Sequence, residues 1–139
     1  MKSSLQTLQR IQKFNIDEQR KILAELQTQE EKLQDSLERL NSEYEREKKF
    51  ALEYPGIGDF GAYTKRYLQY REAFVKQLVA VQAEIEKVRD QIADMFKEQK
   101  TFEIVDDNRQ KRREKENNAK EQKTLDEIGT NAYIKRKKQ

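Results

Sequence analysis

The chain has 139 residues, of which 40% are charged and only 35% are hydrophobic, and its formal net charge is +3. This composition favours long solvated helices with a narrow apolar stripe over a globular enzyme with a large core. The sequence contains no cysteine and no histidine, so the usual zinc ligands, the thiolate nucleophile and the commonest general base are missing. We therefore expect no enzymatic activity and no catalytic, cofactor-binding or metal site.

The N-terminal residues lack the continuous apolar run of a secretory signal. No stretch of the sequence approaches the length of apolar residues that a membrane-spanning helix needs. We accordingly expect a cytoplasmic protein.

The strongest helix breakers gather within seven residues, and they are Pro55, Gly56, Gly58 and Gly61. Only Gly129 lies elsewhere, so two long stretches can form uninterrupted helix. The pattern predicts a helix over residues 3–54, a turn over 55–61 and a second helix over 59–105. Because a short connection places long helices antiparallel, we predict an all-α, two-helix coiled-coil hairpin that forms one domain over residues 1–105.

The first helix is expected to begin at Ser3, because Ser3 and Gln6 have the spacing of a capping box. Its apolar residues recur every three or four positions, as on one face of a helix. They are Leu5, Leu8, Ile22, Leu26, Leu33, Leu37, Leu40, Tyr44, Ala51 and Tyr54.

Eight of the twelve aromatic residues lie around the turn, between Tyr44 and Phe74. Packing in the seam between the helices accounts for the four that are in phase with it, Tyr63, Tyr67, Tyr70 and Phe74. Phe50 and Tyr54, together with Ile57 and Phe60, exceed what a narrow seam can hide. For these residues the sequence leaves two interpretations open, a partner-binding surface at the tip of the hairpin and simple filling of the space where the helices splay.

The turn glycines also fit the dinucleotide-binding pattern G-x-G-x-x-G over residues 56–61. A strand must precede that pattern for it to bind a phosphate, and here a helix precedes it. We therefore interpret the glycines as a helix-hairpin turn.

Asp59 stands where the second helix needs an N-cap. The apolar stripe of this helix is Phe60, Tyr63, Tyr67, Tyr70, Phe74, Leu78, Val81, Ile85, Val88, Ile92 and Met95. If the turn centres near Gly56, the numbers of facing residues sum to about 113, and the expected pairs are Leu40 with Phe74, Leu26 with Val88 and Ile22 with Ile92.

The apolar spacing also predicts a slip in each helix. An extra step of four falls between Ile22 and Leu37, and another falls between Phe74 and Ile85. Because the two windows mirror each other across the turn, both helices can relax their supercoil together and keep their register.

Residues 106–139 form a charged extension with 11 basic and 7 acidic residues. Between Asp106 and Thr124 the only apolar residue is Ala119, so this stretch cannot belong to a seam and is expected to be a single exposed helix or disordered. Its basic runs, residues 111–113 and 135–138, raise the alternative of nucleic-acid binding. That alternative is weaker, because acidic residues interrupt the runs and only Tyr133 could stack on a base.

These features resemble the flagellar FliJ family, soluble components of the flagellar type III export apparatus. The resemblance covers nearly the whole chain: a similar length, a charged two-helix hairpin, Glu43 and Tyr44 before the turn, and an aromatic start to the second helix. Most specific is the run over residues 121–128, which looks like the closing Q-K-x-[LM]-D-E segment of the family and precedes a basic end. Gly129, directly after this run, departs from the pattern.

The resemblance implies a stalk, similar in shape to the shaft of rotary ATPases. Such a stalk engages the hexameric export ATPase and the cytoplasmic face of the membrane export gate, and it handles export chaperones. It implies a location at the flagellar base, on the cytoplasmic side of the inner membrane and held there by protein contacts. Neither a small-molecule ligand nor nucleic acid is expected as a partner.

From the resemblance, we assign the contact with the export gate to Leu40, Tyr44, Phe74 and Leu78. The expected tip surface adds Phe50, Tyr54 and Phe60 to this set. To the ATPase contact we assign Arg112, Arg113, Leu125, Asp126 and Ile128. The main alternative function is a coiled-coil scaffold or chaperone escort that binds through its aromatic tip without any ATPase.

Overall fold

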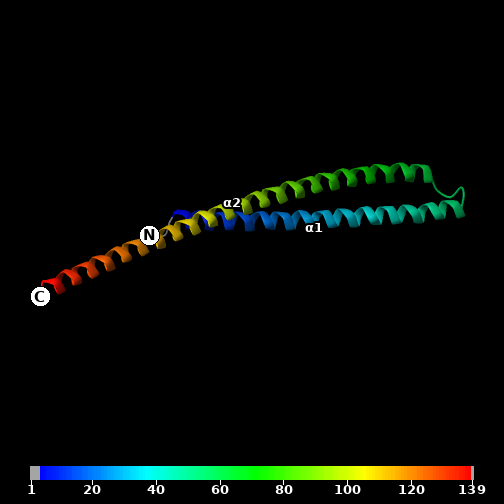
Figure 1. The fold of residues 1–139 in the computed structure, drawn as a ribbon. Coiled ribbons are helices and arrows are strands. Elements are labelled where there is room, and N and C mark those ends of the chain that lie inside the picture. The colour runs from blue at the N-terminus through cyan, green and yellow to red at the C-terminus, as the bar shows by residue number, and fades with distance from the viewer. Residues whose placement is uncertain (1–3, 139) are drawn as a thin grey trace. The chain divides into compact units, whose positions relative to one another are not determined.

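The structure is a computed structural model that describes residues 4–138, and it consists of two long helices joined by a short turn (Figure 1). Helix α1 spans Ser4–Glu53 and helix α2 spans Phe60–Lys137. No strand occurs within the described residues. The prediction of an all-α helical hairpin is confirmed. The chain forms two compact units, residues 12–96 and residues 4–11 with 97–138.

The turn between the helices is built by the predicted helix breakers. Gly56 and Gly58 have φ angles of 90° and 73°, a left-handed conformation that glycine adopts without the steric cost of a Cβ atom. The amide of Ile57 donates a hydrogen bond of 3.3 Å to the carbonyl oxygen of Tyr54, which closes a tight turn around Pro55 and Gly56. The helix-hairpin interpretation of the glycine pattern is therefore confirmed.

Helix α2 begins with the N-cap that the sequence predicted. The amide of Ala62 donates a hydrogen bond of 3.0 Å to Oδ1 of Asp59. This contact satisfies one of the backbone N–H groups that a helix start leaves without an intrahelical partner. The capping box predicted at the start of α1 involves Ser3, which lies outside the described residues.

In the unit over residues 12–96, the two helices pack along an antiparallel seam. Tyr44 of α1 stacks on Tyr67 of α2 with 4.0 Å between the ring centroids. Farther from the turn, the guanidinium carbon of Arg20 lies 5.1 Å from the centroid of the Phe96 ring. The core of the seam lies at Ile16, Val81, Ile85 and Val88, all less than 9% exposed.

The seam follows an unbroken alternation of three- and four-residue steps in both helices. In α1 the buried and half-buried positions on this alternation are Gln12, Ile16, Gln19, Leu23, Leu26, Glu30, Leu33, Leu37, Leu40 and Tyr44. In α2 they are Phe74, Leu78, Val81, Ile85, Val88, Ile92 and Met95. The predicted slips were wrong, because each depended on an exposed residue being counted in the seam, Ile22 in α1 and Tyr70 in α2.

Several residues assigned to the seam are exposed instead. Ile22 is 41% exposed, whereas its neighbour Leu23 is half-buried, so Ile22 does not pack as the seam partner of Ile92. Tyr70 is 60% exposed. The error has one cause: adjacent helix positions differ by about 100°, so a one-residue shift moves a side chain from the seam to its flank.

In the second unit, residues 4–11 pack against the part of α2 that follows residue 96. Leu5 is buried here and Phe102 is half-buried, whereas Leu8, also predicted in the seam, is 47% exposed. Every described residue from Asp107 to Lys138 is exposed.

The sequence left the state of residues 106–139 open between helix and disorder. In the structure α2 continues to Lys137 and passes through Gly129. One glycine disfavours a helix by only about 1 kcal/mol relative to alanine, and unlike proline it keeps its N–H donor. Local contacts support the exposed turns, such as the ion pair of 3.1 Å between Lys111 and Asp107.

Candidate partner-binding surfaces

The part of the hairpin next to the turn is organised around Tyr44. Its ring lies 4.0 Å from Tyr67, 5.6 Å from Phe60 and 6.2 Å from Tyr63, measured between centroids, and all three pairs are stacked. Such aromatic pairs add stabilisation beyond their buried area. The predictions that Tyr63 and Tyr67 lie in the seam are confirmed, since both are half-buried.

Two polar contacts cross the seam at this aromatic stack. The hydroxyl of Tyr67 donates a hydrogen bond of 2.5 Å to Oδ1 of Asn41. The hydroxyl oxygens of Tyr44 and Thr64 lie 3.4 Å apart. Because hydroxyl and amide groups require partners at defined positions, these contacts fix the register of the two helices where the aromatic rings alone could slide.

An apolar surface is exposed beyond the stack, and we call Phe50, Tyr54 and Ile57 the tip patch. These side chains are 45%, 51% and 61% exposed, respectively. The rings of Phe50 and Tyr54 contact each other, with centroids 5.0 Å apart. The seam therefore does not hide this part of the aromatic cluster, and it is free to contact another molecule.

A hollow of about 240 Å³ lies between the tip patch and the start of α2, and we call it the tip hollow. Residues from α1, the turn and α2 line it: Glu47, Phe50, Ala51, Ile57, Gly58, Asp59, Phe60, Tyr63 and Arg66. Glu47 and Ala51 continue the seam spacing after Tyr44. A small alanine at the second of these positions leaves a space that a larger seam residue would fill.

Tyr63, which lines this hollow, has a shifted pKa. The pKa of Tyr63 is raised above its ordinary value of 10.0, first by burial and then by the negative charges of Glu47 and Glu43. Arg46 and Arg66 oppose this shift but contribute less. A phenolate is therefore disfavoured at Tyr63.

The structure places the predicted tip residues in two environments. Phe50 and Tyr54 are exposed. The other five are half-buried at seam positions, namely Leu40, Tyr44, Phe60, Phe74 and Leu78. A partner can therefore reach the first two directly, but it can touch the other five only along the edges of the seam.

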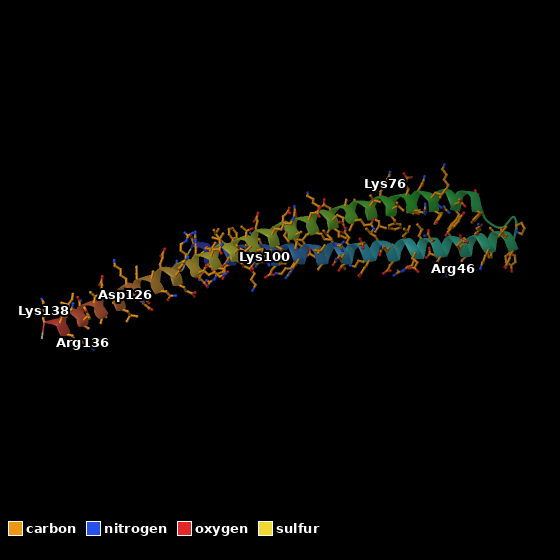
Figure 2. All side chains as sticks on the ribbon, viewed as in Figure 1. Arg46, Lys76, Lys100, Asp126, Arg136 and Lys138 are labelled. Carbon is orange, nitrogen blue, oxygen red and sulfur yellow. The ribbon has the colours of Figure 1, made fainter. Side chains whose placement is uncertain are left out.

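The predicted C-terminal residues all lie on the exposed part of α2: Arg112, Arg113, Leu125, Asp126 and Ile128. Leu125 is 62% exposed and Ile128 is 59% exposed. Their three-residue spacing places both on one face of the helix. Figure 2 shows Asp126 on this stretch, with the basic residues Arg136 and Lys138 nearer the end of the chain.

Sequence reasoning missed the polar and small residues that shape the tip. Asn41 and Thr64 do not stand out in an apolar pattern, although they contact the tyrosine hydroxyls. Ala51 was included in the apolar stripe, but its small size was not recognised as leaving a hollow. The available signal was positional, because Thr64 and Ala51 both fall on the three-four spacing that continues the seam toward the turn.

The fold and these surfaces define the class of the protein, an all-α coiled-coil hairpin with an exposed aromatic tip and an exposed charged helix. Residues 4–138 hold no group of three acidic side chains placed to bind a metal ion, and neither helix contains, over that range, an apolar stretch able to cross a bilayer. The chain belongs to the FliJ family, since the family model described as flagellar FliJ protein matches residues 1–138. It is thus a component of the flagellar export apparatus.

The resemblance drawn from the sequence is confirmed by this match. No curated protein and no solved structure matches the chain significantly.

Proposed function

We propose that this protein is a non-enzymatic stalk that couples the export ATPase to the membrane export gate and escorts export chaperones. Its place of action is the cytoplasmic side of the inner membrane at the flagellar base, where protein contacts hold it. Membership of the FliJ family supports this role. The observation that carries it is the exposed stretch of α2, in which every described side chain from Asp107 to Lys138 faces solvent.

An isolated helix of this kind is only marginally stable in water, because most helical stability comes from packing an apolar face. Docking on a partner supplies that packing. Leu125 and Ile128 offer apolar anchors, while Arg112 and Arg113 offer charge for steering. We assign these residues, together with Asp126, to the ATPase contact.

We assign the gate contact to the tip of the hairpin. Phe50 and Tyr54 are its exposed anchors. The edges of the seam contribute the half-buried members of the set: Leu40, Tyr44, Phe60, Phe74 and Leu78. This division gives the protein two separate contact segments, which a coupling element requires.

The test measures ATP hydrolysis by the purified cognate export ATPase with and without the full-length protein. The protein alone should hydrolyse no ATP, and its addition should change the turnover of the ATPase. In the double variant Leu125→Glu, Ile128→Glu, the concentration of the protein that produces half of the maximal change in ATPase turnover should rise about tenfold. Loss of central apolar anchors has an effect of this size. Ile134→Glu is the matched control, since Ile134 is also exposed but lies about 180° around the helix from Leu125.

Unchanged turnover together with absent binding in a pull-down would contradict the coupling role. The exposed tip patch favours one second candidate, a scaffold or chaperone escort without any ATPase. In that case the Leu125→Glu, Ile128→Glu variant should support flagellar assembly as well as the unmodified protein, whereas substitutions in the tip patch should abolish it.

A further inference from the structure

The apolar lining and the size of the tip hollow suit it to bind a single side chain of a partner. Its walls are apolar where Phe50, Ala51 and Ile57 face Phe60 and Tyr63, and it has a volume of about 240 Å³. That volume admits one large apolar side chain of a partner. Pockets of this kind, next to exposed aromatic residues, are where protein interfaces concentrate their binding energy.

The charged residues that line the hollow carry a net negative charge. They are Glu47, Asp59 and Arg66, and among residues 4–138 none of the three forms an ion pair. Among the charged residues, Glu47 contributes most to the raised pKa of the neighbouring Tyr63. A ligand that places a cation beside its apolar group therefore complements the hollow better than a neutral or acidic one.

We propose that the tip hollow receives one large aliphatic or aromatic side chain from the cytoplasmic part of the export gate, and that an adjacent Lys or Arg of the same segment pairs with Glu47. This inference rests on the proposed function, because it takes the gate as the partner of the tip. It moves the centre of the contact from the half-buried seam residues to the open space that Ala51 creates.

The experiment titrates the purified cytoplasmic domain of the cognate export gate with the full-length protein and measures the dissociation constant. Ala51→Leu places a larger side chain in the hollow and should weaken binding about tenfold or more. The same substitution adds apolar volume at a seam position, so helix content and thermal stability should be equal to or higher than those of the unmodified protein. A loss of binding would then not reflect unfolding.

The proposed cation contact is tested with Glu47→Gln. This variant should bind the gate domain about three- to fivefold more weakly and with a smaller dependence on salt. Leu52→Ala is the matched control: Leu52 is 74% exposed and next to Ala51, yet it does not line the hollow. Its affinity should be unchanged, and all three variants should still act on the export ATPase.

Two failures can be told apart. If the unmodified protein binds the gate domain and Ala51→Leu binds equally well, the inference is overturned while the proposed function stands. If the unmodified protein does not bind the gate domain, the gate contact of the proposed function fails and the inference fails with it. Self-association that Ala51→Leu abolishes, without any effect on gate binding, would assign the hollow to a second copy of the chain and also overturn the inference.

Discussion

The hydroxyl of Tyr67 donates a hydrogen bond of 2.5 Å to Oδ1 of Asn41, and this bond joins α2 to α1 across the seam. Both side chains are half-buried beside the stacked ring of Tyr44. Apolar packing tolerates small sliding movements, whereas a hydrogen bond fails within a few tenths of an ångström. The pair therefore sets the register next to the turn.

Removing this bond should reduce stability. Tyr67→Phe keeps the stacked ring but leaves Asn41 without its partner, so the free energy of unfolding should fall by about 1 kcal/mol. Urea denaturation followed by circular dichroism measures the change. Tyr54→Phe is the control, because Tyr54 is 51% exposed; an equal loss in both variants would refute the role of the bond.

Loss of the N-cap should destabilise the start of α2. In Asp59→Ala the amide of Ala62 loses its acceptor, and the expected cost is about 1 kcal/mol. Asp59→Asn should retain most of the stability, since asparagine also caps helices. Thermal unfolding at constant pH gives the comparison, and identical melting of Asp59→Ala and the unmodified protein would contradict the prediction.

The corrected seam can be tested with two adjacent residues. Leu23 is half-buried and Ile22 is 41% exposed. Leu23→Ala should therefore cost about 1.5 kcal/mol, below the range for fully buried leucines, while Ile22→Ala should cost about 0.5 kcal/mol or less. The denaturant midpoints of the two variants measure these losses of stability. A larger loss for Ile22→Ala than for Leu23→Ala would place Ile22, and not Leu23, in the seam.

Gly129→Ala should stabilise the exposed end of α2. A Cβ atom at this position meets nothing within 4 Å, so the substitution gains helix propensity of about 1 kcal/mol without a clash. The gain is local, so it should appear as slower amide hydrogen exchange around residues 125–134, with little change in the global unfolding midpoint. Unchanged exchange rates there would show that the stretch is not helical in solution.

Alkaline pH should weaken the tip through Tyr63. Burial, followed by the charges of Glu47 and Glu43, raises the pKa of this phenol above 10.0 in the folded protein. The unfolded chain therefore loses the proton first. The stability that Tyr63 contributes is complete below about pH 10 and is lost as the pH rises through the folded pKa.

Spectroscopic titration of tyrosinate, compared between the unmodified protein and Tyr63→Phe, measures this effect. A tyrosinate component with a pKa above 10.0 should be missing in Tyr63→Phe, and the free energy of unfolding above pH 10 should then depend less steeply on pH. Titration of Tyr63 at its ordinary pKa of 10.0 would contradict the assignment.

The sequence alone determined where the chain turns, because proline and glycine act through local backbone sterics that need no tertiary context. It also determined the N-cap at Asp59, the family through the closing segment over residues 121–128, and the absence of histidine and cysteine chemistry. Each of these features depends on residue identity at a fixed spacing, which can be read directly.

Only the tertiary structure decided which side of each helix faces the seam. Glu30 looks polar in the sequence, yet it is half-buried in the seam, whereas the apolar Ile22 and Tyr70 face outward. A residue is buried when its angular position meets the partner helix, and a shift of one position turns it by about 100°. The tip hollow depends on both helices and the turn together, so no single stretch of sequence could show that Ala51 leaves it open.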